Sequence, residues 1–290
     1  MGTMEEKLEA AWRVRYANFP MEIEFTYPAR TAVISLTGNW CALNCAHCGG
    51  HYLKAMMPIG EARLGEATSC LISGGCDAWG RVPVLKHLDE LRRFKESRPQ
   101  LRYNWHTGLI GETEMQAIAP YVDVVSFDFV GDDETIREVY GLRRNVEDYL
   151  DTFRMLRQYI KVIPHITLGL REGRFSGEYR ALEMLKDLGV EGLVVNVFRP
   201  TKGTRYAASS PPEVEEVVDF LASARLVLPQ TPISLGCMRP NGIYRDLLDP
   251  EALRAGVNKI VQPSRKATQL ASDLGMTIRR GEECCVLEQD

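Results

Sequence analysis

Short apolar runs and amphipathic stretches alternate along nearly the whole chain, and this alternation constrains the fold more than any other feature. In the stretch 212–227, for example, the apolar residues recur at helical spacing. The β-rich apolar runs span residues 32–38, 67–73, 102–107, 122–129, 161–168, 193–199, 232–236 and 259–262. Eight strand–helix units without a long linker predict an α/β fold, a TIM-like (β/α)8 barrel that is either open or closed.

The two ends of the chain are predicted to lie outside this barrel. Residues 1–30 are expected to form an N-terminal extension with a helix at 4–17, and residues 31–265 the barrel itself. Residues 266–290 are expected to form a C-terminal helix and a tail that carries cysteines. A chain of 290 residues with 45% hydrophobic content can bury the core of one such domain.

Composition narrows the possible partners and the compartment. The net charge of −4 gives no basic surface for nucleic acid, and no apolar run approaches the length of a membrane span. The first residues are polar and lack a secretory apolar region. Eight cysteines in such a chain indicate a reducing cytoplasm, where cysteine motifs favour metal binding or catalysis over disulfides.

Three cysteines, Cys41, Cys45 and Cys48, follow the first apolar run with the spacing Cys-x3-Cys-x2-Cys. Three thiolates can hold a [4Fe–4S] cluster and leave one iron free to bind a substrate or cofactor. A structural zinc site normally needs a fourth protein ligand, so a zinc knuckle is the weaker alternative. Because barrels place their chemistry on the loops that leave their strands, the trio predicts an open-iron cluster at that edge.

A second candidate element, Ser73-Gly74-Gly75-Cys76, follows the second apolar run. Two glycines at the end of a strand let a ligand approach the backbone closely, because no side chain obstructs it. A simple tight turn is the alternative. The position at a strand end, next to the cysteine loop, favours a ligand contact.

Three later runs each contribute two polar residues spaced two apart, which places both on the same side of their strand. These pairs are Asn104 and His106, Ser126 and Asp128, and His165 and Thr167. Polar residues among apolar neighbours are costly unless something satisfies them. The pairs are therefore either satisfied structural residues or, as three together favour, contacts to a polar ligand in the barrel mouth.

The cysteine spacing and its setting resemble the signature of radical S-adenosylmethionine (SAM) enzymes. In that superfamily the free iron is chelated by SAM, and an aromatic residue often precedes the third cysteine, a place that His47 occupies here. A Gly-Gly-Glu element there receives the SAM amino group. Gly74 and Gly75 are the counterparts of its glycines and Ser73 precedes them, but Cys76 stands where the glutamate would be.

The resemblance implies further SAM contacts. Asp128 is a candidate partner for a ribose hydroxyl, with His106 and Ser126 beside it. Arg144, at the start of a predicted helix, could hold the SAM carboxylate in a charge-assisted pair, the alternative being a solvated helix-cap arginine.

Residues 30–275 are similar to biotin synthase, especially at 144–153, 195–204 and 220–238. This similarity implies a complete barrel with SAM bound across the strand ends, Asn196 among its contacts, and a second iron–sulfur cluster deeper inside. The positions where biotin synthase carries its auxiliary-cluster cysteines read here as Leu71 or one of its neighbours, Asn104 and Ile163. A biotin-synthase-like [2Fe–2S] sulfur donor is therefore not expected.

The remaining cysteines offer another set of ligands. Cys237, Cys284 and Cys285 are predicted to bind an auxiliary [4Fe–4S] cluster, with the tail folding back over a barrel opening. Cys76 could complete the set, although it lies close to the expected SAM site. Cys70 is expected to be a small buried apolar residue.

The segments 41–53, 71–77 and 283–287 together resemble a narrower family, the biotin-synthase-related proteins that act in pairs as a two-component lipoyl synthase. This implies radical-driven sulfur insertion, with the auxiliary cluster as the sulfur source and no side chain acting as a catalyst. The implied partners are an octanoylated lipoyl-carrier protein or peptide, a second radical SAM component and an electron donor such as ferredoxin. Three alternatives stay open: another radical SAM reaction (mutase, lyase or cofactor maturation), a non-catalytic iron–sulfur scaffold, and a zinc-binding interaction protein.

Overall fold

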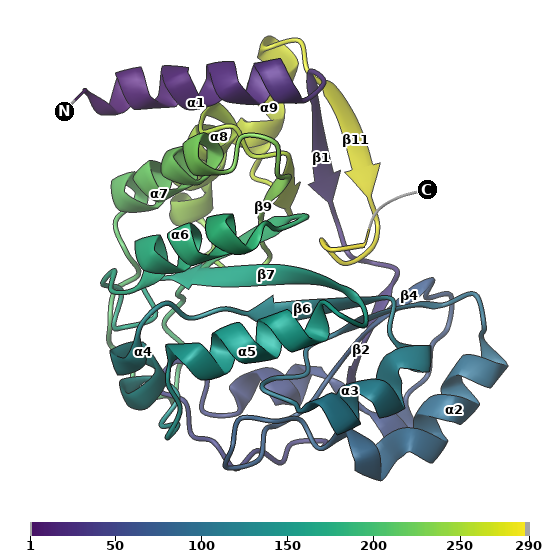
Figure 1. The fold of residues 1–290 in the computed structure, drawn as a ribbon. Helices are drawn as coiled ribbons and strands as arrows, with labels where there is room; N and C mark the ends of the chain where they lie inside the picture. Colours follow the sequence, from purple (N-terminus) through teal and green to yellow (C-terminus); the bar gives the residue numbers. More distant parts are fainter. Residues whose placement is uncertain (1, 288–290) are drawn as a thin grey trace.

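A single curled, parallel sheet forms the centre of the molecule in the computed structural model, which describes residues 2–287 (Figure 1). Its strands are all parallel and do not close into a ring, so β11 and β3 form the two edges. Their order is β11 (Thr277–Gly281), β1 (Glu22–Thr26), β10 (Lys259–Val261), β9 (Ile233–Leu235), β8 (Leu193–Val197), β7 (Lys161–Leu168), β6 (Val124–Asp128), β5 (Arg102–Trp105), β4 (Ser69–Ser73), β2 (Thr31–Ser35) and β3 (Met57–Pro58). The predicted α/β fold is confirmed as a TIM-like half-barrel, and each of the eight predicted runs contains a strand.

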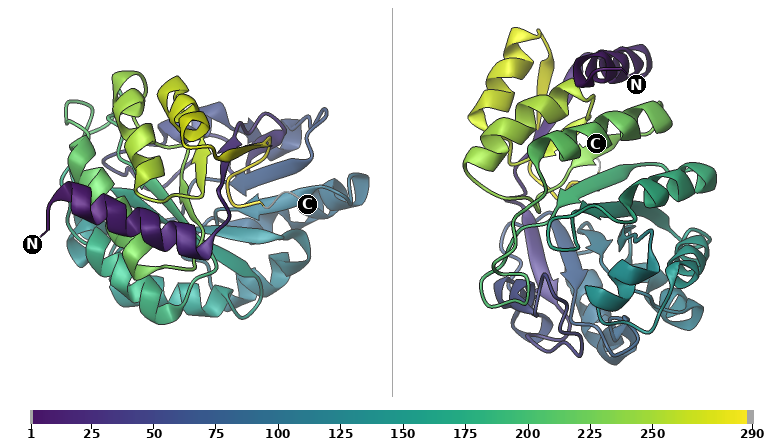
Figure 2. Two further views of the ribbon diagram at one scale, coloured as in Figure 1. Left: turned by 90° about the horizontal axis from the view of Figure 1, so that it is seen from above. Right: turned by 90° about the vertical axis from the view of Figure 1, so that its left-hand side faces the viewer.

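Helices cover the convex face of the sheet (Figures 1 and 2). They are α1 (Met4–Asn18), α2 (Leu88–Ser97), α3 (Glu112–Ile118), α4 (Asp133–Glu138), α5 (Val146–Leu156), α6 (Glu178–Leu188), α7 (Val214–Val227), α8 (Ile243–Arg254) and α9 (Arg265–Asp273). Short 3-10 helices lie at His51–Ala55, Ile59–Glu61, Val84–His87 and Ala119–Tyr121. Among residues 2–287, no helix combines the length and the apolar character that crossing a lipid bilayer requires.

Alternation along the strands separates the helix-covered face from the lumen of the half-barrel. On β6, Phe127 packs against Phe153 of α5, with ring centroids 6.0 Å apart. Val124, which lies on the opposite face of the same strand, belongs instead to a separate apolar cluster with Val286 and Leu287. Asp128 shares that second face, so the predicted polar pairs point into the lumen.

Both terminal segments add strands that the sequence analysis did not predict. β1 lies within the predicted extension and β11 within the predicted tail, and they pair in parallel over five residues each. The predicted helix at 4–17 corresponds to α1, and the predicted C-terminal helix corresponds to α9. Residue 1 and the tail residues 288–290 lie outside the described chain, and the three-part division of the chain stays a prediction.

After β11 the chain enters the lumen through the segment Glu282–Leu287, called here the lumen segment. Its buried carboxylate, Glu283, accepts hydrogen bonds from Thr68 and Arg102, which flank the beginnings of β4 and β5. Val286 and Leu287 then pack in an apolar cluster with residues of β6, β7 and β8. The lumen segment therefore fills the barrel from the amino ends of the strands.

Candidate cofactor and metal site

The cysteine trio lies on the loop that leaves β2, at the carboxyl edge of the sheet. Cys41, Cys45 and Cys48 are partly buried free thiols. Burial, followed by the charges of its two neighbours, raises the pKa of Cys45 to about 12. Burial also raises the pKa of Cys48. Cys45 and Cys48 therefore keep their protons until a metal ion displaces them, as expected of cluster ligands in the metal-free protein.

Backbone hydrogen bonds hold the loop in place. The Ala42 amide donates to the Cys76 carbonyl (2.8 Å), and the Ala46 amide donates to the Val139 carbonyl (2.7 Å). The Tyr206 amide in turn donates to the Ala46 carbonyl at 3.1 Å. Three distant parts of the chain therefore fix the trio, and its position does not depend on the loop alone.

The glycine pair lies directly beneath this loop. A Cβ atom on Gly75 would stand 1.8 Å from the Trp40 carbonyl oxygen and 2.6 Å from Cys41 Cα. On Gly74 the nearest atoms, from Thr37, would be 3.2 Å away. Gly75 therefore serves first to let the cysteine loop pack closely, a role that is neither the predicted ligand contact nor the simple tight turn. Ser73 donates its hydroxyl to the His106 carbonyl at 3.2 Å.

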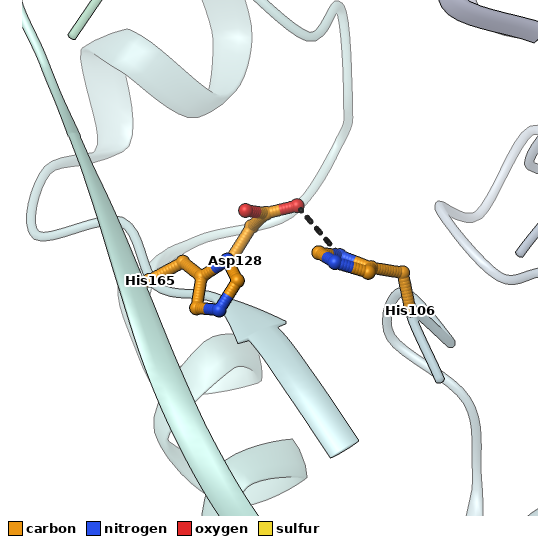
Figure 3. Close-up of side chains that lie close together, drawn as sticks. All are labelled: His106, Asp128 and His165. Carbon is orange, nitrogen blue, oxygen red and sulfur yellow. Dashed lines mark ion pairs between the residues drawn. The ribbon is translucent and has the colours of Figure 1, made fainter. Parts of the chain in front are cut away.

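His106, Asp128 and His165 converge in the lumen (Figure 3). One ligand atom from each lies within 4.8 Å of the other two, and His106 Nδ1 is 3.7 Å from Asp128 Oδ2. Desolvation opposes both charges, but the carboxylate raises the pKa of His106, and His106 in turn holds the pKa of Asp128 below its usual value. Burial, aided by the charge of His106, lowers the pKa of His165 to about 3.

Ser126 and Asn104 satisfy each other below this group. The Ser126 hydroxyl donates to Asn104 Oδ1 at 2.8 Å, and both side chains are buried. Asn104 Nδ2 then donates to the sulfur of Cys284 at 3.1 Å. Ser126, predicted as a SAM contact, therefore has a structural partner inside the protein.

Four buried polar atoms of the predicted cofactor region have no hydrogen-bond partner: His47 Nδ1, Arg144 Nε, His165 Nε2 and Asn196 Oδ1. Buried polar atoms nearly always have partners in folded proteins. Burial lowers the pKa of His47 to about 4, so its ring is neutral. Together with the trio of thiols, these atoms fit a lumen that receives a polar cofactor.

Arg144 lies near the mouth but is already engaged. Its guanidinium forms an ion pair with Asp148 (3.0 Å) and lies 5.5 Å from the ring centroid of Trp79. It is therefore neither a free anion-binding group nor a fully solvated cap. Its role toward SAM remains a prediction.

The second cysteine set gathers around the lumen segment. The Cys284 thiol accepts hydrogen bonds from Cys285 and Asn104, and the first of these contributes most to lowering its pKa to about 6. The Cys285 carbonyl accepts a hydrogen bond from Lys259 at 3.0 Å. Cys237, by contrast, follows β9 and is exposed; desolvation and then the charge of Cys284 raise its pKa.

Cys76 lies with the first set and not with the second. Its carbonyl is 3.8 Å from Cys41 Sγ, and after burial the charges of Cys41 and Cys45 contribute most to raising its pKa. This differs from the expectation that Cys76 completes the auxiliary set. Cys70 is fully buried, as predicted.

Two residues that matter here have no specific role that the sequence predicts. His165 is predicted only as one of the paired lumen residues, and the register that sets Asp128 opposite His165 is not visible in the sequence. Glu283 gave no signal beyond its place beside the tail cysteines, since its partners Thr68 and Arg102 lie far away in the chain.

Comparison with known proteins bears on both fold and family. No family model matches the chain. Biotin synthase from Desulforudis audaxviator (strain MP104C) is 28% identical over 219 residues, which cover 71% of this chain and 64% of that protein, less than two thirds of its length. The crystal structure of methylornithine synthase (PylB) has a TM-score of 0.67 at 14% identity and covers 97% of this chain and 91% of its own. That of HydG, a maturase of the [FeFe]-hydrogenase, has a TM-score of 0.70 at 14% identity and covers 95% and 68%.

The structural likenesses establish the fold, because their sequence identity is too low to carry more. The sequence likeness to biotin synthase adds to the geometry of the cysteine loop after β2. Together they support membership of this chain in the radical SAM superfamily.

Proposed function

We propose that this chain is a radical SAM enzyme that inserts sulfur into an octanoyl chain on a lipoyl-carrier protein, as one component of a two-component lipoyl synthase. The observation that carries the proposal is the position of Cys284. Its sulfur accepts a hydrogen bond from Asn104, and its segment packs against Ile163. In the biotin synthase resemblance these two strand positions correspond to auxiliary-cluster cysteines, so the lumen segment brings thiols to a place where the strands lack them.

The trio Cys41, Cys45 and Cys48 would hold a [4Fe–4S] cluster, and Cys237, Cys284 and Cys285 an auxiliary one. When bound, the first cluster and SAM would supply the means to remove a hydrogen atom from an unactivated C–H bond, and the auxiliary cluster would supply the sulfur.

The side chains and backbone of this chain position the cofactor and the cysteines, and they exclude water from the lumen. Asn196 offers an unpartnered buried oxygen to SAM, and Gly75 lets the cysteine loop pack closely against the end of β4. Val286 and Leu287 are buried at the opposite end of the lumen, where they exclude water. Asn104, held by Ser126, orients Cys284.

The partners belong to the same proposal: an octanoylated carrier domain, a second radical SAM component and an electron donor such as ferredoxin. An apolar octanoyl chain has no polar handle near its reactive carbon. Its position must therefore come from the carrier protein and from the walls of the lumen.

The test uses anaerobically reconstituted protein with its partner enzyme, SAM, a reductant and an octanoylated carrier domain. Mass spectrometry should detect a mono-thiolated carrier, or its conversion to the dithiol. The double variant Cys284→Ser/Cys285→Ser should still form 5′-deoxyadenosine and yield no sulfur product. Replacing the trio with Ala should abolish 5′-deoxyadenosine and leave about one cluster bound.

Cys70→Ala is the matched control, because Cys70 is fully buried and is not a member of either cysteine set; it should keep both activities. If 5′-deoxyadenosine accumulates while neither the octanoyl nor the mono-thiolated carrier gains sulfur, the lipoyl proposal is wrong and another radical SAM reaction is favoured. Undiminished 5′-deoxyadenosine formation by the trio variant would also contradict the assignment of Cys41, Cys45 and Cys48 to the cluster that cleaves SAM.

A further inference from the structure

A cavity of about 260 Å³ lies at the amino ends of β7, β8, β9 and β10, at the opposite end of the strands from the cysteine trio. It is called here the amino-end cavity. Two of its lining residues, Glu191 and Pro232, are exposed and mark its opening to solvent. Its inner wall contains the buried side chains of Ile163 and Val194. Because a water takes up about 30 Å³ in the liquid, the cavity has room for several small molecules.

The amino-end cavity reaches the lumen segment, since Cys285 and Val286 line it. Lys259 holds this part of the segment by donating a hydrogen bond to the Cys285 carbonyl at 3.0 Å. Cys285 is only partly buried, whereas Cys70 is fully buried. Cys284 and Cys285 pack together against the apolar cluster that forms the inner wall of the cavity. The cavity therefore leads to these two cysteines from the side that the trio does not occupy.

The other side of the lumen segment is anchored to the barrel. Glu283 accepts hydrogen bonds from Thr68 and Arg102, which flank the beginnings of β4 and β5. The segment is thus fixed against one half of the sheet, and the amino-end cavity lies beside it at the other half.

The charges that line the amino-end cavity balance. Among the described residues they are two lysines, Lys161 and Lys259, and two glutamates, Glu24 and Glu191, so the formal charges cancel. Lys259 and Glu24 form an ion pair at 3.1 Å. A small anion that enters therefore meets polar walls and ammonium groups without a net negative charge to repel it.

We propose that the amino-end cavity is the port through which inorganic sulfide reaches the second cysteine set. The inference rests on the proposed function, in which sulfur leaves the second cluster with the product and must be replaced. SAM and the acyl chain would occupy the carboxyl side of the lumen, so a supply from the amino side does not compete with them. Sulfide arrives as hydrosulfide and loses its proton when it binds iron. Its oxidation state does not change, so its entry needs no electron donor or acceptor.

Ser234→Phe tests the port by filling the cavity. Ser234 lies on β9, lines the cavity and is 8% exposed. The iron-free full-length chain is treated with iodoacetamide, and the alkylation of each cysteine is followed by tandem mass spectrometry of its peptide. Ser234→Phe should slow alkylation of Cys285 by about tenfold or more, because a thiol closed off from solvent reacts only through local opening. Alkylation of Cys41, at the opposite end of the strands, should not change.

Ser272→Phe is the matched control, because Ser272 lies exposed on α9 and does not line the cavity. It should leave the alkylation of Cys285 unchanged. Cluster formation is measured on the same two variants in a background where the trio is replaced with Ala, by iron content and visible absorbance after addition of Fe(II) and sulfide. Ser234→Phe should slow this uptake without changing the final iron content.

The two readouts separate the port from the proposed function. If the trio variant binds no iron, the second cluster and the proposed function are wrong, and the sulfide port falls with them. If it binds iron while Ser234→Phe changes neither alkylation nor uptake, the port alone is wrong. Circular dichroism checks that Ser234→Phe folds. Should it unfold, the unchanged chain decides, since Cys285 should react faster than the fully buried Cys70; an equal or slower rate overturns the port.

Discussion

Gly75→Ala tests the packing that holds the cysteine trio. The new Cβ would lie 1.8 Å from the Trp40 carbonyl oxygen, and Cβ atoms essentially never come closer than 3.0 Å to such an atom. The loop must therefore retreat by at least 1.2 Å (3.0 minus 1.8), and the obstructing atoms are backbone, which cannot rotate away. Overpacking of this kind costs about 1–3 kcal/mol, and we expect the upper end of that range.

Two other glycines provide a graded comparison. Gly74→Ala would place its Cβ 3.2 Å from the Thr37 side chain, which can shift by a few tenths of an ångström, so a smaller loss is expected. Gly60→Ala meets nothing within 4 Å and has no left-handed backbone. It should be neutral or stabilising by about 0.4–1 kcal/mol, because alanine reduces the entropy of the unfolded chain.

The assay is urea unfolding of the iron-free chain, combined with iron content after anaerobic reconstitution. Gly75→Ala should lower the free energy of unfolding most and should lose iron from the trio, because Cys41 moves with the loop. The free energy of unfolding should be highest for Gly60→Ala, lower for Gly74→Ala and lowest for Gly75→Ala. A Gly75→Ala protein with normal stability and full iron content would refute the close-packing role.

The remaining predictions concern two other sites. Arg239 and Asp249 form a fully buried ion pair with two hydrogen bonds of 2.9 Å each. Asp249→Asn leaves the Arg239 charge unpaired, so it should lower the free energy of urea unfolding by about 3–5 kcal/mol. A loss below about 1 kcal/mol would contradict this. Desolvation opposes the charge of Asp219, but hydrogen bonds from Lys7 and Tyr179 outweigh it and lower its pKa. The stabilisation of the fold by ionised Asp219 is therefore fully present at pH values above its ordinary pKa of 3.8. It is lost as the pH falls through the lower pKa that Asp219 has in the folded protein. Because Asp219 is partly exposed, Asp219→Asn should lower the free energy of unfolding by about 1 kcal/mol at pH 7 and by almost nothing near pH 2. A difference in unfolding free energy between the variant and the unchanged chain that stays constant with pH would contradict this.

The sequence predicts the barrel strands well because each carries its own local signal. The run at 161–168, for example, coincides with β7 residue for residue. β1 and β11 escape prediction because β11, Thr277-Ile-Arg-Arg-Gly281, is a mostly exposed edge with little apolar content. Its pairing partner β1 lies at the other end of the chain, and no local pattern encodes such a pairing.

For the site, the spacing of Cys41, Cys45 and Cys48 predicts a common loop because the three lie within eight residues. The grouping of the other cysteines depends on tertiary structure. Cys76 joins the first set because a loop hydrogen bond brings its carbonyl to Ala42. The side-chain convergence at His165 depends on strand register and on the curvature of the sheet, which residue types alone do not determine.

The contact between Asn104 and Cys284 joins residues 180 positions apart. Contacts between residues far apart in the chain form late in folding, because closing a long loop loses conformational entropy before the contact can stabilise the fold. We therefore expect the strands around Asn104 to be protected from hydrogen exchange before the lumen segment docks, which pulse labelling during refolding can test. The loop of Cys41, Cys45 and Cys48 would then be formed while Cys284 and Cys285 are still open to solvent, so iron offered during refolding would meet the first cysteine set in its folded loop and the second set before it is buried.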